Sequence, residues 1–194
     1  MRRLFLSTVF VALAAMAPGA MAQGLVVPHD QAASPRLDEH RWSVGTEVGV
    51  MTVHTTPLFN LEVPVEYTMP LGPGDLAFHA GFMLSVGGDR TVRNRFNVPT
   101  VRSSVWIGLP FGARYKIRVL DSHPLYVWPM MDFGPLIDTW DGDAAGFFRT
   151  GAGISYLVHP HVELLFRPIT VGTVFGPGGA WFLYNMTMGA NFRF

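Results

Sequence analysis

The chemistry that this chain could perform starts with its histidines. A histidine can activate a serine hydroxyl when an acidic side chain orients the imidazole. No histidine here is followed two residues later by a serine, and the nearest candidate set is His79 with Ser85 or Ser155 and Glu62 or Glu66. The alternative is that His79 is a hydrogen-bonded member of a polar interior. We favour that alternative and predict no catalytic residue and no enzyme activity.

Two short motifs could bind a metal ion. His159-Pro160-His161 offers two imidazoles but has no third or fourth ligand nearby, as a zinc site would need. Asp138, Asp141 and Asp143 are similar to a calcium loop, but the spacing is wrong and no glutamate closes it. We therefore predict neither a metal site nor a cofactor.

Arginines gather in one stretch of the chain. They are Arg90, Arg93, Arg95 and Arg102, in and beside the longest expected link, residues 87–99. The planar guanidinium group matches phosphate oxygens, so this cluster could contact phosphate groups. A simply solvated loop is the alternative.

The elements that position these residues follow a period of two. In residues 182–194 every even position from Phe182 to Phe194 is apolar, and the odd positions after Leu183 are polar or glycine. That alternation predicts a strand with one apolar and one polar face. An exposed apolar edge strand invites aggregation, and closing the sheet into a barrel surrounded by lipid removes the edge. A soluble lipocalin-like barrel is the rival fold.

The same alternation predicts eight strands and an all-β fold, an eight-stranded antiparallel up-and-down transmembrane β-barrel. The expected strands are residues 41–53, 58–69, 76–86, part of 100–120, 125–137, 147–158, 162–174 and 182–194. The fifth is the least regular, because Pro129 and Pro135 each remove a backbone donor. Strands of about ten residues suit a tilted crossing of a bilayer.

The beginning of the chain has the pattern of a secretory signal peptide. Arg2 and Arg3 precede an apolar run, and Ala20-Met21-Ala22 matches a small-residue cleavage site. We predict a signal peptide at 1–22, a flexible periplasmic lead-in at 23–40 and the barrel at 41–194. With no cysteine, the mature chain is expected to lack disulfides and a lipid anchor. Removing two arginines leaves 12 basic and 14 acidic residues, a balance that gives no reason to expect a nucleic-acid partner.

These features together resemble the small OmpX-type or OmpA-type barrels of bacterial outer membranes. The resemblance rests on the signal peptide, the eight alternating strands and Phe194, over nearly all of the mature chain. It implies an outer-membrane location, and a barrel-assembly signal at Phe192 and Phe194 that the insertion machinery recognises. It also implies a monomer in contact with membrane lipid and lipopolysaccharide, whose phosphates the four arginines could bind. We expect a non-enzymatic role in envelope structure or surface interaction. The alternatives are a lipid-modifying enzyme similar to lipid A deacylases, or a narrow pore.

Inward-facing positions carry charges of both signs. The interior set is Glu47, Glu62, Glu66, Arg114, Asp132, Arg149, Glu163, Arg167 and Arg193. The lumen of an eight-stranded barrel is just wide enough for side chains to fill it. Charges removed from water must be paired, so we predict a closed polar core, with Arg114 beside Asp132 and Glu163 beside Arg193.

Overall fold

A computed structural model describes residues 40–93, 99–120, 123–139, 143–176 and 179–194, and the side chains among these except those of residues 89–102. The described residues belong to one compact unit, residues 34–194. The predicted signal peptide and all of the predicted lead-in except His40 lie outside the described residues. Among the residues described, no helix is long and apolar enough to cross a membrane.

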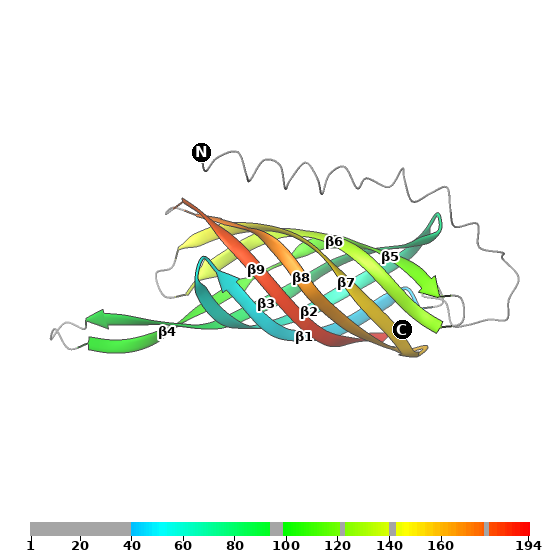
Figure 1. Ribbon diagram of the computed structural model, residues 1–194, viewed down its shortest axis with the longest axis horizontal. Helices are drawn as coiled ribbons and strands as arrows, with labels where there is room; N and C mark the ends of the chain where they lie inside the picture. Colours follow the sequence, from blue (N-terminus) through cyan, green and yellow to red (C-terminus); the bar gives the residue numbers. More distant parts are fainter. Residues whose placement is uncertain (1–39, 94–98, 121–122, 140–142, 177–178) are drawn as a thin grey trace, which may run out of the picture. The chain divides into compact units, whose positions relative to one another are not determined.

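Nine antiparallel strands make up the described part of the chain. They are β1 (Trp42–Val53), β2 (Thr56–Leu71), β3 (Gly74–Arg93), β4 (Pro99–Gly108), β5 (Phe111–Leu120), β6 (His123–Asp138), β7 (Ala144–His159), β8 (Val162–Gly176) and β9 (Gly179–Arg193). Strands that are neighbours in sequence pair with each other, except β4 and β5, and β1 also pairs with β9. The sheet therefore closes on itself as an up-and-down barrel (Figure 1).

The ring has eight positions because β4 and β5 share one of them. Both strands pair with β3 on one side and with β6 on the other. Between them lies Pro110, which has no N–H group to give to the ladder. Backbone hydrogen bonds to the adjacent strands continue on both sides of the segment between β4 and β5. The Leu109 N–H donates to the Pro135 carbonyl at 3.1 Å, and the Gly81 N–H donates to the Pro110 carbonyl at 2.9 Å. The prediction of an eight-stranded barrel is confirmed.

Side chains alternate between the two faces of the barrel wall as predicted. On β2, Phe59 and Val65 are exposed, whereas Asn60 and Glu66 are fully buried in the lumen. On β9, Met188 is 57% exposed and its neighbour Thr187 is buried. An apolar exterior around a polar lumen is the arrangement of a barrel surrounded by hydrocarbon.

The lumen is not polar along its whole length, which corrects the predicted polar core. At the end where β1 runs into β2, inward positions are apolar, and they form one packed cluster. This far-end apolar cluster consists of Met51, Val53, Leu58, Met83, Leu136, Phe147, Val174 and Leu183. Trp106, Ala145 and Trp181 pack against it. The predicted interior set was chosen from charged residues alone, so it did not include these uncharged inward residues.

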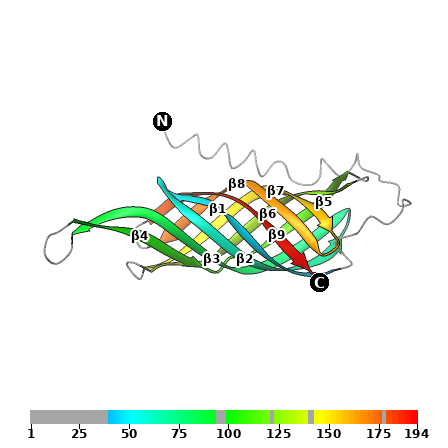
Figure 2. The ribbon, with the colours of Figure 1, turned by 90° about the horizontal axis from the view of Figure 1, so that it is seen from below.

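The hairpin of β3 and β4 is longer than the sequence suggests. Residues 87–99 were expected to form a link, but β3 continues to Arg93 and β4 starts at Pro99. Figures 1 and 2 both show this two-stranded ribbon extending past the far end of the barrel. The strand pairing is irregular between Gly87 and Arg90, where Gly87 and Gly88 have φ values of 145° and 67°. Glycine adopts positive φ at little cost, so it suits this bulge.

An arginine placed on the exterior should destabilise the barrel according to its depth. Met186 lies near the middle of β9 and Leu71 is the last residue of β2, and both are exposed. We expect Met186→Arg to lower the free energy of unfolding from lipid vesicles by about 2–4 kcal/mol, and Leu71→Arg by about 0–1 kcal/mol. Denaturant titration of folded protein in vesicles measures both. Equal losses at the two positions would contradict a membrane-spanning exterior.

Candidate functional site in the barrel lumen

The predicted charged residues of the lumen form one continuous chain of ion pairs. It begins beside the seam of β1 and β9, where Arg193 Nη1 lies 3.2 Å from Glu163 Oε2. Glu163 Oε2 also lies 3.0 Å from Lys116 Nζ. Lys116 in turn pairs with Glu66 from β2. Acid and base therefore alternate from the first pair onward.

The chain of ion pairs continues through Arg114. Its Nη1 lies 3.6 Å from Glu66 Oε2, and its Nη2 lies 2.6 Å from Glu47 Oε1. The guanidinium carbon also lies 4.8 Å from the centre of the Trp128 ring, within the range of a cation–π interaction. Arg167 Nη2 then joins Glu47 Oε2 at 3.2 Å to Glu62 Oε1 at 2.9 Å.

Glu62 is the most heavily bonded carboxylate of the chain. Arg149 approaches it with both terminal nitrogens, each at 2.7 Å, which is the bidentate arrangement that makes arginine–carboxylate pairs strong. Asn60 and Asn185 donate to Oε1 at 2.7 and 2.9 Å. Both carboxylate oxygens of Glu62 are therefore satisfied away from water.

Asp132 ends the chain of pairs. Arg149 Nη2 lies 2.8 Å from Asp132 Oδ2, and His79 Nε2 lies 2.7 Å from Oδ1. Gly112 faces Asp132 across the strands, and a Cβ atom there would lie 2.2 Å from Oδ1. Glycine at this position thus leaves room for the carboxylate.

Seven of the eight positions around the ring, all except that of β3, contribute to the chain of ion pairs, and its charges balance. The acids are Glu47, Glu62, Glu66, Asp132 and Glu163, and the bases are Arg114, Lys116, Arg149, Arg167 and Arg193. Each of these ten residues is at most 3% exposed. Buried charges are tolerated only when they are paired and hydrogen-bonded, so this balance is a condition of the fold.

A bulge in β8 allows Arg167 to face the lumen. The register shifts between Arg167 and Thr170 in the pairing with β9 and between Phe166 and Ile169 in the pairing with β7, and Arg167 and Thr170 are fully buried. Two inward residues three positions apart cannot occur in regular alternation, so the bulge is required. On the exterior, Tyr184 donates its hydroxyl to the Pro168 carbonyl at 2.9 Å. That bond satisfies a carbonyl group released by the bulge.

The structure gives a mixed result for the predicted pairs. All nine predicted interior residues are buried, and Glu163 and Arg193 are paired as the sequence analysis suggests. The predicted contact between Arg114 and Asp132 is wrong. Asp132 lies opposite Gly112 in the register, two residues from Arg114, which turns instead to Glu47 and Glu66.

Sequence reasoning also omitted Lys116 from the interior set. Lys116 links Glu66 to Glu163 and is fully buried. The signal was present, because Lys116 has the same inward parity as Arg114 two residues earlier. Alternation alone would have found it.

The possible catalytic set around His79 is not assembled. Ser85 donates its hydroxyl to Asn60 Oδ1 at 2.7 Å, and the Ser155 hydroxyl has no hydrogen-bond partner. Glu62 and Glu66 are held by arginine and lysine partners rather than by His79. A nucleophile, a base and an orienting acid are therefore not joined here as a triad requires.

The remaining candidate residues lie at the two ends of the barrel. His161 donates its backbone N–H to His159 Nδ1 at 3.3 Å, and its own Nδ1 lies 2.9 Å from the Arg193 carbonyl. Among the described residues, no group of three histidine, aspartate or glutamate side chains could hold a metal ion. Asp141 of the calcium-like motif lies outside the described residues, as does Arg95.

The two residues of the predicted assembly signal lie on the seam of the barrel. Phe192 and Phe194 are 56% and 57% exposed. Phe194 donates its N–H to the Trp42 carbonyl at 2.9 Å, and its carbonyl accepts from Trp42 at 3.2 Å. Both residues therefore belong to the contact between β9 and the start of β1.

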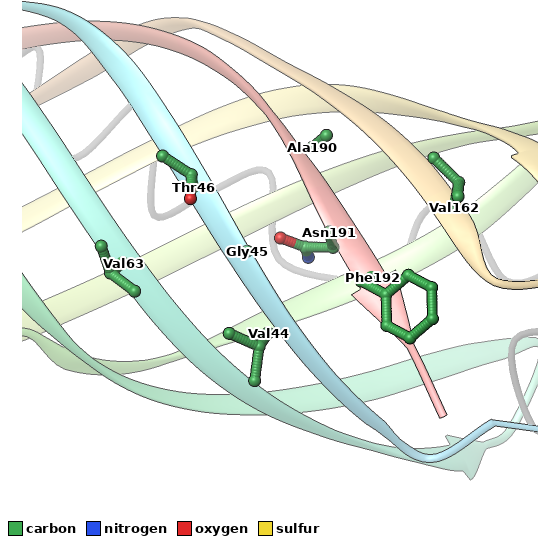
Figure 3. A pocket seen from close by; sticks show the side chains of 8 residues that line it. All are labelled: Val44, Gly45, Thr46, Val63, Val162, Ala190, Asn191 and Phe192. Atoms are coloured by element: carbon green, nitrogen blue, oxygen red, sulfur yellow. The ribbon is translucent and has the colours of Figure 1, made fainter.

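A shallow depression lies near the same seam (Figure 3). Its lining comes from four strands: Val44, Gly45, Thr46, Val63, Val162, Ala190, Asn191 and Phe192. Asn191 lies opposite Gly45, where a Cβ atom would fall 1.8 Å from the amide oxygen. Most of the lining is apolar and none of it is charged, so the depression offers little polar chemistry.

Comparison with known proteins supports the fold and no closer relationship. No protein-family model and no curated protein matches this chain. The crystal structure of Neisserial surface protein A (NspA) is similar over 79% of this chain and 97% of that one, with a TM-score of 0.52 at 12% identity. The outer membrane enzyme PagL is similar over 78% and 99%, with a TM-score of 0.50 at 9% identity. The chain has the fold of the small eight-stranded outer-membrane β-barrels.

Breaking one pair of the chain should be costly, and breaking both members less so. Asp132→Ala removes one of the two carboxylates that Arg149 contacts and leaves the lumen with an uncompensated positive charge, so it should lower the free energy of unfolding by about 3–5 kcal/mol. The double variant Asp132→Ala/Arg149→Ala should lose less than the sum of the two single losses. Denaturant titration of the four proteins measures the coupling. As a control, Asp132→Ala with Arg193→Ala, at the other end of the chain of pairs, should be closer to additive.

Proposed function

We propose that this chain is an integral outer-membrane protein with a non-enzymatic role in envelope structure or surface interaction. The observation that carries the proposal is a lumen filled by paired charges and by the far-end apolar cluster, inside a wall with an apolar exterior. Such a barrel is a rigid scaffold, and the parts it offers to other molecules are its two ends. Its partners are outer-membrane lipid and lipopolysaccharide, and the barrel-insertion machinery during assembly.

Side-chain packing argues against a pore. Trp128, Phe147, Arg149 and Arg167 are all no more than 1% exposed and project into the lumen. An eight-stranded barrel leaves little space beyond what such side chains fill. Water and ions would have to displace both paired charges and packed apolar groups to pass.

A lipid-modifying enzyme is the second candidate. The likeness to the outer membrane enzyme PagL favours it, although identity is only 9%. Against it stands the geometry around His79, whose ion-pair partner is Asp132 and which has no serine bonded to it.

The function can be tested with the purified protein and a deletion strain. We expect the folded protein to migrate differently on a gel before and after boiling, and to show at most rare, small openings in a planar bilayer. The lipid A species of cells with and without the gene should be the same. A steady, large conductance would support the pore instead, and an altered lipid A inventory would support the enzyme.

Assembly should depend on Phe194. Its backbone bonds with Trp42 close the seam, and we propose that Phe192 and Phe194 also serve as the assembly signal. Phe194→Asp places a charge at a position that is apolar and 57% exposed on the outer face. The fraction of protein folded in the outer membrane should fall sharply, as measured by heat-modifiable migration. Asp143→Ala, at an exposed position outside the strands, serves as the control and should fold normally.

A further inference from the structure

The depression at the seam of β1 and β9 arises where two small outward residues face each other. Thr46 on β1 lies opposite Ala190 on β9, and both are exposed on the exterior (Figure 3). The outward pairs on either side of them carry larger side chains, and they are Val44 with Phe192 and Val48 with Met188. The wall is therefore hollowed at Thr46 and Ala190, and we call this hollow the seam depression.

The seam depression suits part of a hydrocarbon chain. Its volume is about 340 Å³, and its lining is mostly apolar and carries no charge. On the exterior of a membrane barrel every group already meets hydrocarbon, so a hollow gains little from the hydrophobic effect. It holds a chain through close van der Waals packing, which is weak for each atom pair. A polar contact beside the hollow is needed to select one kind of molecule.

Aromatic and basic residues border the seam depression on the side where β1 starts. The rings of Trp42 and Tyr67 lie 5.0 Å apart, and those of Phe192 and Phe194 lie 6.5 Å apart. Arg41, which precedes β1, is exposed, and its Nη1 lies 3.5 Å from the Tyr67 hydroxyl. Tryptophan and tyrosine are enriched where lipid headgroups meet water, and a guanidinium group matches phosphate oxygens. This border therefore has the chemistry that a phosphorylated headgroup needs.

We propose that the seam depression binds one glycerophospholipid, with an acyl chain over Thr46 and Ala190 and the phosphate at Arg41. At about 3.3 Å per residue, Arg41 and Thr46 are roughly 16 Å apart along β1. A phosphate and the upper part of its acyl chain can span that distance together. The inference rests on the proposed outer-membrane location with this end on the periplasmic side, where glycerophospholipid forms the leaflet.

Native mass spectrometry of folded full-length protein, released from detergent micelles, counts bound lipids and measures their affinity. The probes are dioleoyl phosphatidylglycerol, the diacylglycerol with the same chains, and glycerophosphoglycerol, which is the headgroup without chains. The wild type should bind one phosphatidylglycerol. R41Q should weaken that binding about tenfold, as loss of one charge-assisted hydrogen bond predicts, and leave diacylglycerol binding unchanged.

Filling the hollow should affect both lipids. A190F should weaken phosphatidylglycerol and diacylglycerol binding alike by about fivefold, which corresponds to about 1 kcal/mol of lost chain packing. A190L makes the same test with a smaller side chain. A152F alters an exposed alanine on β7 outside the depression, and R118Q removes the same charge from β5 at the same end of the barrel. Both controls should change binding less than twofold.

The controls decide between a site and a general effect of the exterior. Equal losses in A190F and A152F, or in R41Q and R118Q, would overturn the proposal. Diacylglycerol bound by the wild type as tightly as phosphatidylglycerol would also overturn it, because the phosphate would not be recognised. Binding of glycerophosphoglycerol that depends on Arg41 but is unchanged in A190F would show a phosphate site alone and overturn the lipid assignment.

Thermal unfolding separates lipid binding from a structural role of Arg41. Phosphatidylglycerol should raise the unfolding temperature of the wild type and raise that of R41Q less. Without added lipid the two should unfold at nearly the same temperature, because Arg41 is exposed. A lower temperature for R41Q without lipid, together with an equal shift on adding lipid, would overturn the proposal. Heat-modifiable migration of each variant tests the barrel itself, so loss of the lipid site with normal migration leaves the proposed function standing.

Discussion

Burial of charge in a closed lumen is the constraint on which the rest of this barrel depends. The chain of ion pairs places ten charged side chains inside the wall, and removing a charged group from water costs several kcal/mol unless a partner compensates it. The alternating chain from Arg193 to Asp132 provides that compensation. Because its members come from seven of the eight positions around the ring, the pairing can be completed only when the barrel has closed.

Several local features are explained by the same constraint. The bulge in β8 brings Arg167 inward, where it joins Glu47 to Glu62. Gly112 leaves space for Asp132, and Gly153 leaves space for the Trp128 ring, since a Cβ atom there would lie 2.3 Å from Cη2. These irregular positions are thus parts of the lumen packing rather than defects of the sheet.

The lumen is filled by two kinds of packing, one in each of its two zones. Paired charges and hydrogen-bonded amides fill the part nearer the start of β1 and the end of β9, and the apolar cluster fills the far end. Apolar side chains need no hydrogen-bond partners when they are buried, whereas buried polar groups would each need one.

The sequence by itself determined the number of positions around the ring, the approximate bounds of most strands and the face on which most of their residues lie. Period-two alternation carries that information locally, because successive side chains of a strand point to opposite sides. It therefore identified the nine interior charges, and the same parity would have added Lys116. It also anticipated β6 despite Pro129 and Pro135, whose neighbours still complete the strand.

Only the tertiary structure decided which charges meet. Arg114 and Asp132 face the same lumen from adjacent strands, yet the register offsets them by two residues and Arg114 reaches Glu47 across the barrel. Contacts across a lumen depend on the stagger of all the strands around the ring and on bulges such as that in β8. That information is not local to any strand. The far-end apolar cluster and the length of the β3–β4 ribbon emerged for the same reason, since both depend on where neighbouring strands stop pairing.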